Sequence, residues 1–245
     1  MRIVVIHGAP RMEKGNTHLV LTPFLEGCSR AGAQVETVLL AKQKIKQCVG
    51  CFTCYAKTPG VCVHKDDMPS LSEKIRESDL MVFATPVYLD GMTSLAKTFL
   101  DRLVVFLDPH FEVKGDGLVH PLRTKFPEKL FLVSVCGYPG LHNFDPLVLH
   151  IKRVAHNLHS SFSGALLRPG VFSLLLSKKY PEKIDGIMAA ISKAGEELVQ
   201  TGKVRAELIE RAAAEVCPAV ELMGIANKSW DRELAKRDAA PEKTQ

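Results

Sequence analysis

Four cysteines stand close together in the run CVGCFTCYAKTPGVC. Cys48, Cys51 and Cys54 are separated by two residues each, and Cys62 follows after seven more. Thiolates at such short spacing can ligate a metal, pair in a disulfide or act as a redox couple, while small thiols are also common in buried cores. The spacing therefore predicts either a chemical site or a packed loop, and by itself it leaves these alternatives open.

A second stretch, GAPRMEKGNT, is polar, carries glycines and leads into an expected helix. The N-terminus of a helix binds phosphate through its free backbone N–H groups and the positive end of the helix dipole. Arg11, Asn16 and Thr17 could add donors there. The stretch is neither a Walker loop nor a GxGxxG motif, so it suits one terminal phosphate better than a dinucleotide. An unliganded turn between a strand and a helix is an equally good interpretation.

Two further loops could hold the rest of a ligand. The stretch TPVYLDGMT contains Pro86, Tyr88 and Gly91, and it offers an apolar edge for a flat aromatic group. The stretch CGYPGLHN contains Gly137 and Gly140, which allow close approach of a backbone. A packing role for Tyr88 and a turn-forming role for Pro86 are the alternatives.

Strand and helix patterns alternate along the chain. Continuous apolar runs predict buried strands, and stretches with helical periodicity lie between them. Strands are expected at 3–6, 35–40, 80–83, 130–135 and near 165–176, and helices at 17–31 after an Asn16 cap, 66–78, 92–107 and 181–201. This order predicts an α/β fold, a flavodoxin-like doubly wound five-stranded parallel sheet with helices on both faces. Its ligand site should lie beyond the carboxyl ends of the first and third strands.

Composition and charge narrow the class of protein. The chain has 245 residues, 46% of them hydrophobic and 24% charged, which is enough for one large globular domain with extensions. The start, MRIVVIHGAP, shows no long apolar region typical of a signal peptide, so we expect a cytoplasmic protein that does not span a membrane. A net charge of +5 with scattered Lys and Arg favours an anionic cofactor over nucleic acid. In a reducing cytosol, clustered cysteines favour metal or redox chemistry over structural disulfides.

Taken together and in order, the motifs resemble a known family. GAPRMEKGNT, AGAQVETVLL, CVGCFTCYAKTPGVCVHKDDM and SDLMVFATPVYLDGMTSLAKTFLDR are similar to the flavodoxin-like NAD(P)H-dependent FMN reductases, and most similar to their iron–sulfur flavoprotein branch. The resemblance covers roughly residues 1–140 and is looser beyond them. It implies an FMN cofactor and NAD(P)H as the electron donor.

Carried over by position, the resemblance also implies the residues that bind FMN. The phosphate would lie against Pro10, Arg11, Asn16 and Thr17, and the ring against Pro86, Val87, Tyr88, Gly91, Gly137 and Tyr138. No side chain is assigned as a catalytic acid or base, because the chemistry would take place at N5 of the flavin.

For the cysteines, the resemblance implies ligands of a [4Fe–4S] cluster: Cys48, Cys51, Cys54 and Cys62. Structural zinc sites more often pair two separated CxxC knuckles, which are absent from this sequence. The remaining alternative is a segment that keeps its cysteines without a cluster, as an ordered loop over the flavin or at a dimer interface.

Three functions follow as hypotheses. The first is an FMN-dependent oxidoreductase that passes electrons from NAD(P)H to a small acceptor such as a quinone or flavin. The second is an iron–sulfur flavoprotein that carries electrons between protein partners. The third is a non-catalytic zinc-binding regulatory module on a flavodoxin fold, because a fold does not fix a function. By analogy with the family, we expect a homodimer or tetramer.

The expected domain organisation is one sheet domain with an extension. Residues 1–202 form the flavodoxin-like FMN-binding domain, with a cysteine-rich segment at 45–64 and an insertion at 108–125 that we interpret as a long loop. Residues 203–245 form a helical C-terminal extension and a polar tail. From about Asn227, polar composition predicts a tail that is extended, frayed or docked on a partner subunit.

Overall fold

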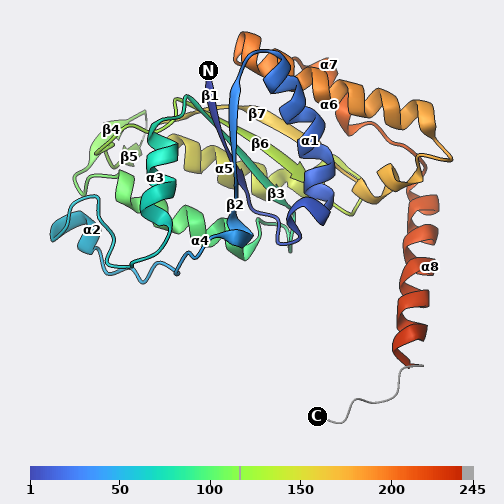
Figure 1. Cartoon of the computed structure of the whole chain (residues 1–245), viewed down its shortest axis with the longest axis horizontal. Coiled ribbons are helices and arrows are strands. Elements are labelled where there is room, and N and C mark those ends of the chain that lie inside the picture. The colour runs from blue at the N-terminus through green and yellow to red at the C-terminus, as the bar shows by residue number, and fades with distance from the viewer. Residues whose placement is uncertain (116, 239–245) are drawn as a thin grey trace.

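A five-stranded parallel sheet forms the centre of the molecule in the computed structural model, which describes residues 1–115 and 117–238 (Figure 1). The strands lie in the order β2-β1-β3-β6-β7, and all neighbours are parallel. Their bounds are β1 Arg2–His7, β2 Gln34–Leu39, β3 Leu80–Pro86, β6 Lys129–Val135 and β7 Ser161–Arg168. This is the flavodoxin-like doubly wound order, so the predicted fold class is confirmed.

Helices cover both faces of this sheet. On one face α1 (Asn16–Arg30) and α6 (Pro181–Thr201) share an apolar core with the strands, and on the other face α3 (Met68–Arg76), α4 (Ser94–Arg102) and α5 (Asp145–Asn157) share a second one. Smaller elements complete the chain: α2 Thr53–Ala56, α7 Ala206–Ala213, α8 Ala219–Asp238, β4 Glu112–Lys114, β5 Gly117–Val119 and several short 3₁₀ segments. The helix expected at 92–107 is thus α4 followed by a 3₁₀ turn, Leu103–Phe106.

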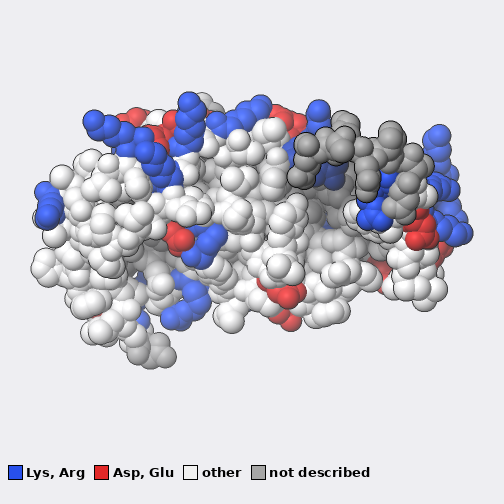
Figure 2. Space-filling model, turned by 90° about the horizontal axis from the view of Figure 1, so that it is seen from below, with Lys and Arg blue, Asp and Glu red and all other residues white. Residues whose placement is uncertain are grey.

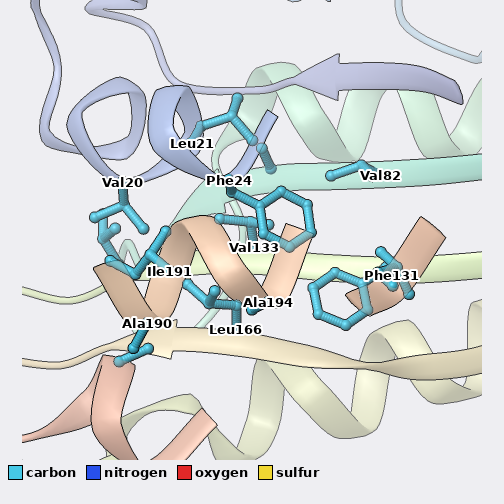
Figure 3. Close-up of a cluster of buried hydrophobic side chains, with 14 of the residues drawn as sticks. Val20, Leu21, Phe24, Val82, Phe131, Val133, Leu166, Ala190, Ile191 and Ala194 are labelled. Atoms are coloured by element: carbon cyan, nitrogen blue, oxygen red, sulfur yellow. The ribbon is translucent and has the colours of Figure 1, made fainter. Parts of the chain in front are cut away.

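Alternation along the strands divides the buried side chains between the two cores. Val82 and Phe131 point to the face covered by α1 and α6, and their neighbours Phe83 and Leu132 point to the other face. Figure 3 shows Phe24 of α1 beside Phe131, and the two rings stack with their centroids 5.3 Å apart. The three central strands β1, β3 and β6 are buried on both faces, which explains their continuous apolar runs in the sequence.

The two helices of the first core approach each other at a pair of glycines. A Cβ atom built on Gly27 of α1 would lie 1.9 Å from the carbonyl oxygen of Ser192, and one built on Gly195 of α6 would lie 2.0 Å from the carbonyl oxygen of Phe24. Any side chain at either position would force the helices apart. These two glycines therefore allow contact between backbones and set the spacing of α1 and α6.

Two predicted element boundaries are wrong. The strand expected near 165–176 ends at Arg168, and Val171–Leu176 form a 3₁₀ helix instead. Pro169 has no N–H for the ladder and Gly170 takes the left-handed conformation with φ 56°, so the chain turns there. Asn16 does not cap α1, because it is the first helical residue and Gly15 occupies the cap position.

The expected helical C-terminal extension is confirmed, and its last helix continues into the part expected to be a tail. Described residues of the tail expected from Asn227 continue α8 to Asp238, and residues 239–245 lie outside the described part. Figure 1 shows α8 pointing away from the sheet. The insertion at 108–125 contains the antiparallel pair β4 and β5, with residue 116 outside the description. Among the helices that the structure describes, none combines the length and apolar character needed to cross a membrane.

Candidate functional site

Three loops meet at the carboxyl edge of the sheet. They follow β1, β3 and β6, which are adjacent strands, so the loops at 8–17, 86–93 and 136–143 are neighbours in space. Figure 2 looks at the molecule from this side: the middle of the face is largely uncharged, and Lys and Arg gather mainly around its rim. All of the residues expected to bind FMN lie on these loops, and the fold brings the loops together.

The first loop ends at a helix N-terminus that has no side-chain cap. No acidic residue lies in the first turn of α1, and no side chain accepts a hydrogen bond there. The N–H groups of Asn16 and Thr17 have no carbonyl inside the helix to bond, and the dipole makes this end positive. Thr17 is buried, while Pro10 and Arg11 are exposed at the rim. These features fit the terminal phosphate of FMN.

A buried histidine lies at the start of this loop. His7 is fully buried at the end of β1, and within the described residues neither of its ring nitrogens has a hydrogen-bond partner. Burial lowers the pKa of His7, and the neighbouring His18, whose ring centroid is 6.1 Å away, lowers it further. His7 is therefore held neutral beneath the loop. No role was expected for His7 from the sequence. The feature that could have identified it is a histidine at the end of an apolar strand.

The second loop contains a tight turn with unusual backbone angles. Tyr88 and Gly91 exchange two backbone hydrogen bonds of 2.9 and 3.1 Å, and the residues between them, Leu89 and Asp90, have φ of 45° and 62°. Two consecutive left-handed residues form a type I′ turn, which costs free energy when neither residue is glycine. The turn holds Tyr88 outward, with 51% of its surface exposed. Pro86 and Val87 are half-buried at its base.

Thr93, which the sequence analysis did not single out, joins the first two loops. Its hydroxyl caps α4 by accepting a hydrogen bond of 3.2 Å from the N–H of Ala96, and donates one of 2.6 Å to the carbonyl oxygen of Gly8. Gly8 has no room for a side chain, because a Cβ there would lie 2.8 Å from that of Ala96. The start of the first loop is thus fixed against the start of α4. A threonine immediately before a helix was the available signal.

The third loop is anchored on β7 and the 3₁₀ helix after it. The N–H of Cys136 donates to the carbonyl of Arg168 at 3.0 Å, and the N–H of Gly170 donates to the carbonyl of Tyr138 at 2.8 Å. Gly137 lies against the ring of Phe172: a Cβ atom built on Gly137 would lie 2.8 Å from a carbon of that ring. Tyr138 remains 74% exposed, so both tyrosines of the expected ring-binding set are available at this edge.

The four clustered cysteines line a single pocket of about 280 Å³. Cys54 is buried, Cys62 is half-buried, and Cys48 and Cys51 are exposed. The opposite wall is formed by the end of α4 and the turn after it, including Arg102 and Val105. All seven cysteines of the chain are free thiols. The spacing that looked chemical in the sequence therefore corresponds to one cavity with four sulfur atoms in its wall.

The electrostatics of this pocket suit a cationic group. Burial raises the pKa of the Cys54 thiol, and the nearby Cys62, Cys48 and Cys51 raise it further because several thiolates repel one another. Hydrogen bonds from the side chain and backbone of Thr53 lower the pKa of Cys51. A positively charged metal core would remove the repulsion and bind the thiolates. Within residues 1–115 and 117–238, however, no three Cys, His, Asp or Glu side chains stand close enough to hold a metal ion, so the ligand set stays a prediction.

The N-terminal half of the chain is similar to flavin reductases and flavoproteins. Residues 1–120 match the family model of NADPH-dependent FMN reductase. An iron–sulfur flavoprotein of Archaeoglobus fulgidus is 41% identical over 106 residues, which is 43% of this chain and 47% of that protein. An iron–sulfur flavoprotein of Methanocaldococcus jannaschii is 33% identical over 102 residues, 42% of this chain and 51% of that protein. The aligned regions span about half the length of these relatives. The predicted resemblance to NAD(P)H-dependent FMN reductases and iron–sulfur flavoproteins is confirmed.

Solved structures confirm the fold over a larger part of the chain. The NAD(P)H:quinone oxidoreductase of Methanothermobacter marburgensis matches with a TM-score of 0.60 at 15% identity, over 81% of this chain and 96% of that one. An FMN-dependent NADH-azoreductase of Bacillus anthracis, solved in complex with FMN, matches with a TM-score of 0.57 at 12% identity, over 81% of this chain and 99% of that one. At these identities the matches bear on architecture alone.

Proposed function

We propose that the chain is an FMN-dependent oxidoreductase that takes electrons from NAD(P)H and transfers them to a small acceptor such as a quinone or flavin. One observation carries the proposal: the uncapped N-terminus of α1 and the two tyrosine-bearing loops meet at the carboxyl edge of a sheet whose N-terminal half matches FMN reductases. Bound FMN would supply hydride acceptance from the nicotinamide and release of electrons as a pair or singly.

The protein's own residues would bind and orient the flavin. The N–H groups at Asn16 and Thr17, with Arg11 at the rim, would hold the phosphate. Val87 donates its N–H to the carbonyl of Val135 at 2.9 Å, and this bond would keep the ring-binding loop in place. Exposed Tyr88 and Tyr138 would cover part of the ring and limit access of water.

The cysteine pocket favours a second function on the same scaffold, an iron–sulfur flavoprotein that performs electron transfer to protein partners. All four cysteines line one cavity, and several curated relatives carry the name iron–sulfur flavoprotein. We propose that Cys48, Cys51, Cys54 and Cys62 hold a [4Fe–4S] cluster, which would supply one-electron chemistry. The helix α4 begins after the ring-binding loop and ends at this pocket. Its nine residues give it a length of about 13 Å.

An anaerobic preparation tests both functions. We expect yellow protein with about one FMN per chain, and oxidation of NAD(P)H when a quinone is added. Iron and sulfide in equal amounts, with a broad absorption shoulder, would support the cluster. Cys54→Ala should remove the shoulder and leave FMN bound, whereas the control Cys217→Ala, outside the pocket, should change neither. Colourless protein with stoichiometric zinc would contradict both functions and favour the zinc-binding regulatory module.

We also propose that the protein is a homodimer. The face over the strand ends has an uncharged middle, and it carries exposed aromatic side chains at Tyr88 and Tyr138. An FMN site open on one face would be completed by a second subunit, and apolar exposure of this kind is typical of an interface.

A further inference from the structure

The cysteine segment is closed at its base by a ladder of hydrogen bonds. The N–H of Lys44 donates to a carboxylate oxygen of Asp67 at 2.6 Å, and the N–H of Asp67 donates back to the carbonyl of Lys44 at 3.1 Å. One step further in, the N–H of Lys46 donates to Asp66 at 3.0 Å. The chain therefore leaves and returns at the same point, and the four cysteines lie on the loop between.

Arg102, the last residue of α4, reaches into this base. Its guanidinium donates to both carboxylate oxygens of Asp66, at 2.6 and 3.2 Å, and to the carbonyl oxygen of Lys46 at 2.7 Å. The side chains of Arg102 and Asp66 are only 1% and 2% exposed. The planar guanidinium thus holds both ends of the cysteine segment, Lys46 where the chain enters it and Asp66 where the chain leaves it. Its contact with Asp66 has the bidentate geometry that makes such pairs strong.

The buried pair is oriented toward the cysteines. Arg102 lines the cysteine pocket, while Asp66 lines a neighbouring pocket that shares Cys62, Val63 and His64 with it. Burial opposes the charge of both groups, yet their contacts hold the pKa of Asp66 below its usual value and raise that of Arg102. Cys62 also attracts the guanidinium. Both groups are therefore charged at neutral pH, and the positive end of the pair faces the sulfur atoms.

We propose that Arg102 is the positioning residue of the cysteine site: it clamps the base of the segment at Lys46 and Asp66 and presents a desolvated positive charge to the pocket. The clamp is a property of the folded chain, whereas the effect of the charge on a bound cluster rests on the proposed iron–sulfur function. A positive charge near the cluster favours its reduced, more negative state, so Arg102 raises the reduction potential and Asp66 lowers it.

Four variants of the full chain with FMN bound separate these effects. Arg102→Gln removes the clamp and the charge, and Arg102→Lys keeps a charge but loses the planar fork. Asp66→Asn keeps Arg102 and removes its counter-charge. Lys97→Gln is the matched control, because it removes one positive charge from the exposed surface of the same helix, where Lys97 pairs with Asp101.

Hydrogen exchange measures the clamp and needs no cluster. We expect the amides of Lys46 and Asp67 to exchange at least about tenfold faster in Arg102→Gln and Arg102→Lys, since charged hydrogen bonds are lost, and to be unchanged in Lys97→Gln. If Arg102→Gln fails to fold, Arg102→Lys carries this comparison. Exchange at the wild-type rate in both Arg102 variants would overturn the clamp.

Redox titration of the reconstituted cluster measures the charge. We expect a lower potential in Arg102→Gln, a higher one in Asp66→Asn and no shift in Lys97→Gln, with the FMN potential constant throughout. Shifts of the same sign in Arg102→Gln and Asp66→Asn, or no shift, would overturn the electrostatic role. If the wild-type chain takes up no iron and sulfide, the iron–sulfur function is wrong, and the exchange experiment still decides the clamp.

Discussion

The hydroxyl of Thr93 donates a hydrogen bond of 2.6 Å to the carbonyl oxygen of Gly8. This contact joins two residues that are 85 positions apart, and both are buried. Gly8 opens the loop proposed for the FMN phosphate, and Thr93 closes the loop proposed for its ring. This hydroxyl therefore adds to the backbone hydrogen bond from Gly8 to Ala84 in fixing the two halves of the site relative to each other.

Replacing this hydroxyl should affect both stability and FMN binding. In Thr93→Val the carbonyl of Gly8 loses its buried partner and α4 loses its cap, so we expect the free energy of unfolding to fall by about 1–3 kcal/mol. FMN should bind more weakly, because the phosphate loop loses one of the contacts that fix it. Urea unfolding and fluorescence titration with FMN measure the two effects. Thr98→Val, a half-buried position on α4, is the control, and equal behaviour of the two variants would contradict the role of Thr93.

The glycine pair between α1 and α6 gives a stability prediction with an internal control. Gly195→Ala places a methyl group 2.0 Å from the carbonyl oxygen of Phe24, so the helices must separate and we expect a loss of about 1–3 kcal/mol or more. Gly186 lies on the same helix with nothing within 4 Å of its Cβ position. Gly186→Ala should therefore stabilise the protein by up to about 1 kcal/mol. Thermal or urea unfolding compares them, and a stabilising Gly195→Ala would show that the contact is not tight.

The fold was predictable from the sequence because its central strands β1, β3 and β6 are buried on both faces. Continuous apolar runs such as Ile3–Ile6 and Leu80–Phe83 have few other interpretations, and their alternation with helices fixes a parallel sheet. The end of β7 was missed because apolar residues continue past Arg168 to Leu176. The strand nevertheless ends at Arg168, because Pro169 and Gly170 form a turn.

The candidate site was predictable only in part. Motif order located the loops, but the contacts that fix them join distant residues and carry no local signal. Arg102 and Asp66 are 36 positions apart, and in the sequence each is an ordinary charged residue near a helix end. Their burial as a pair is a property of the tertiary structure. A helical C-terminal extension was expected, but α8 continues beyond Asn227, where polar composition predicted a tail.

His7 predicts a specific loss of stability in acid. Burial lowers its pKa in the folded state below the value of about 6.5 expected when unfolded, so the unfolded chain binds a proton that the folded chain does not. Its contribution is present above that value and is lost as the pH falls from about 6.5 toward the folded pKa. We expect His7→Leu to show a smaller drop in unfolding free energy between about pH 7.5 and pH 5 than the wild type. His142→Gln, at an exposed histidine, should keep the wild-type drop, and an unchanged drop in His7→Leu would mean that His7 is not the acid-sensitive group.

The last prediction concerns the exposed face of α8 and the proposed dimer. Val220, Met223, Trp230 and Leu234 follow a helical spacing that places them on one face, and each is exposed. A single subunit leaves this stripe in water, so we expect it to be buried when two subunits associate. Trp230 is the one tryptophan of the chain and reports on its surroundings directly.

In the wild type, we expect sedimentation to give a dimer and Trp230 emission to shift toward longer wavelength on dilution. Leu234→Lys should sediment as a monomer with water-exposed emission at every concentration, because a charge on the stripe opposes burial. Ser229→Lys adds the same side chain on the opposite face of the helix and should behave as the wild type. A wild-type monomer, or a dimer in which Leu234→Lys leaves Trp230 emission unchanged, would show that α8 does not form the interface.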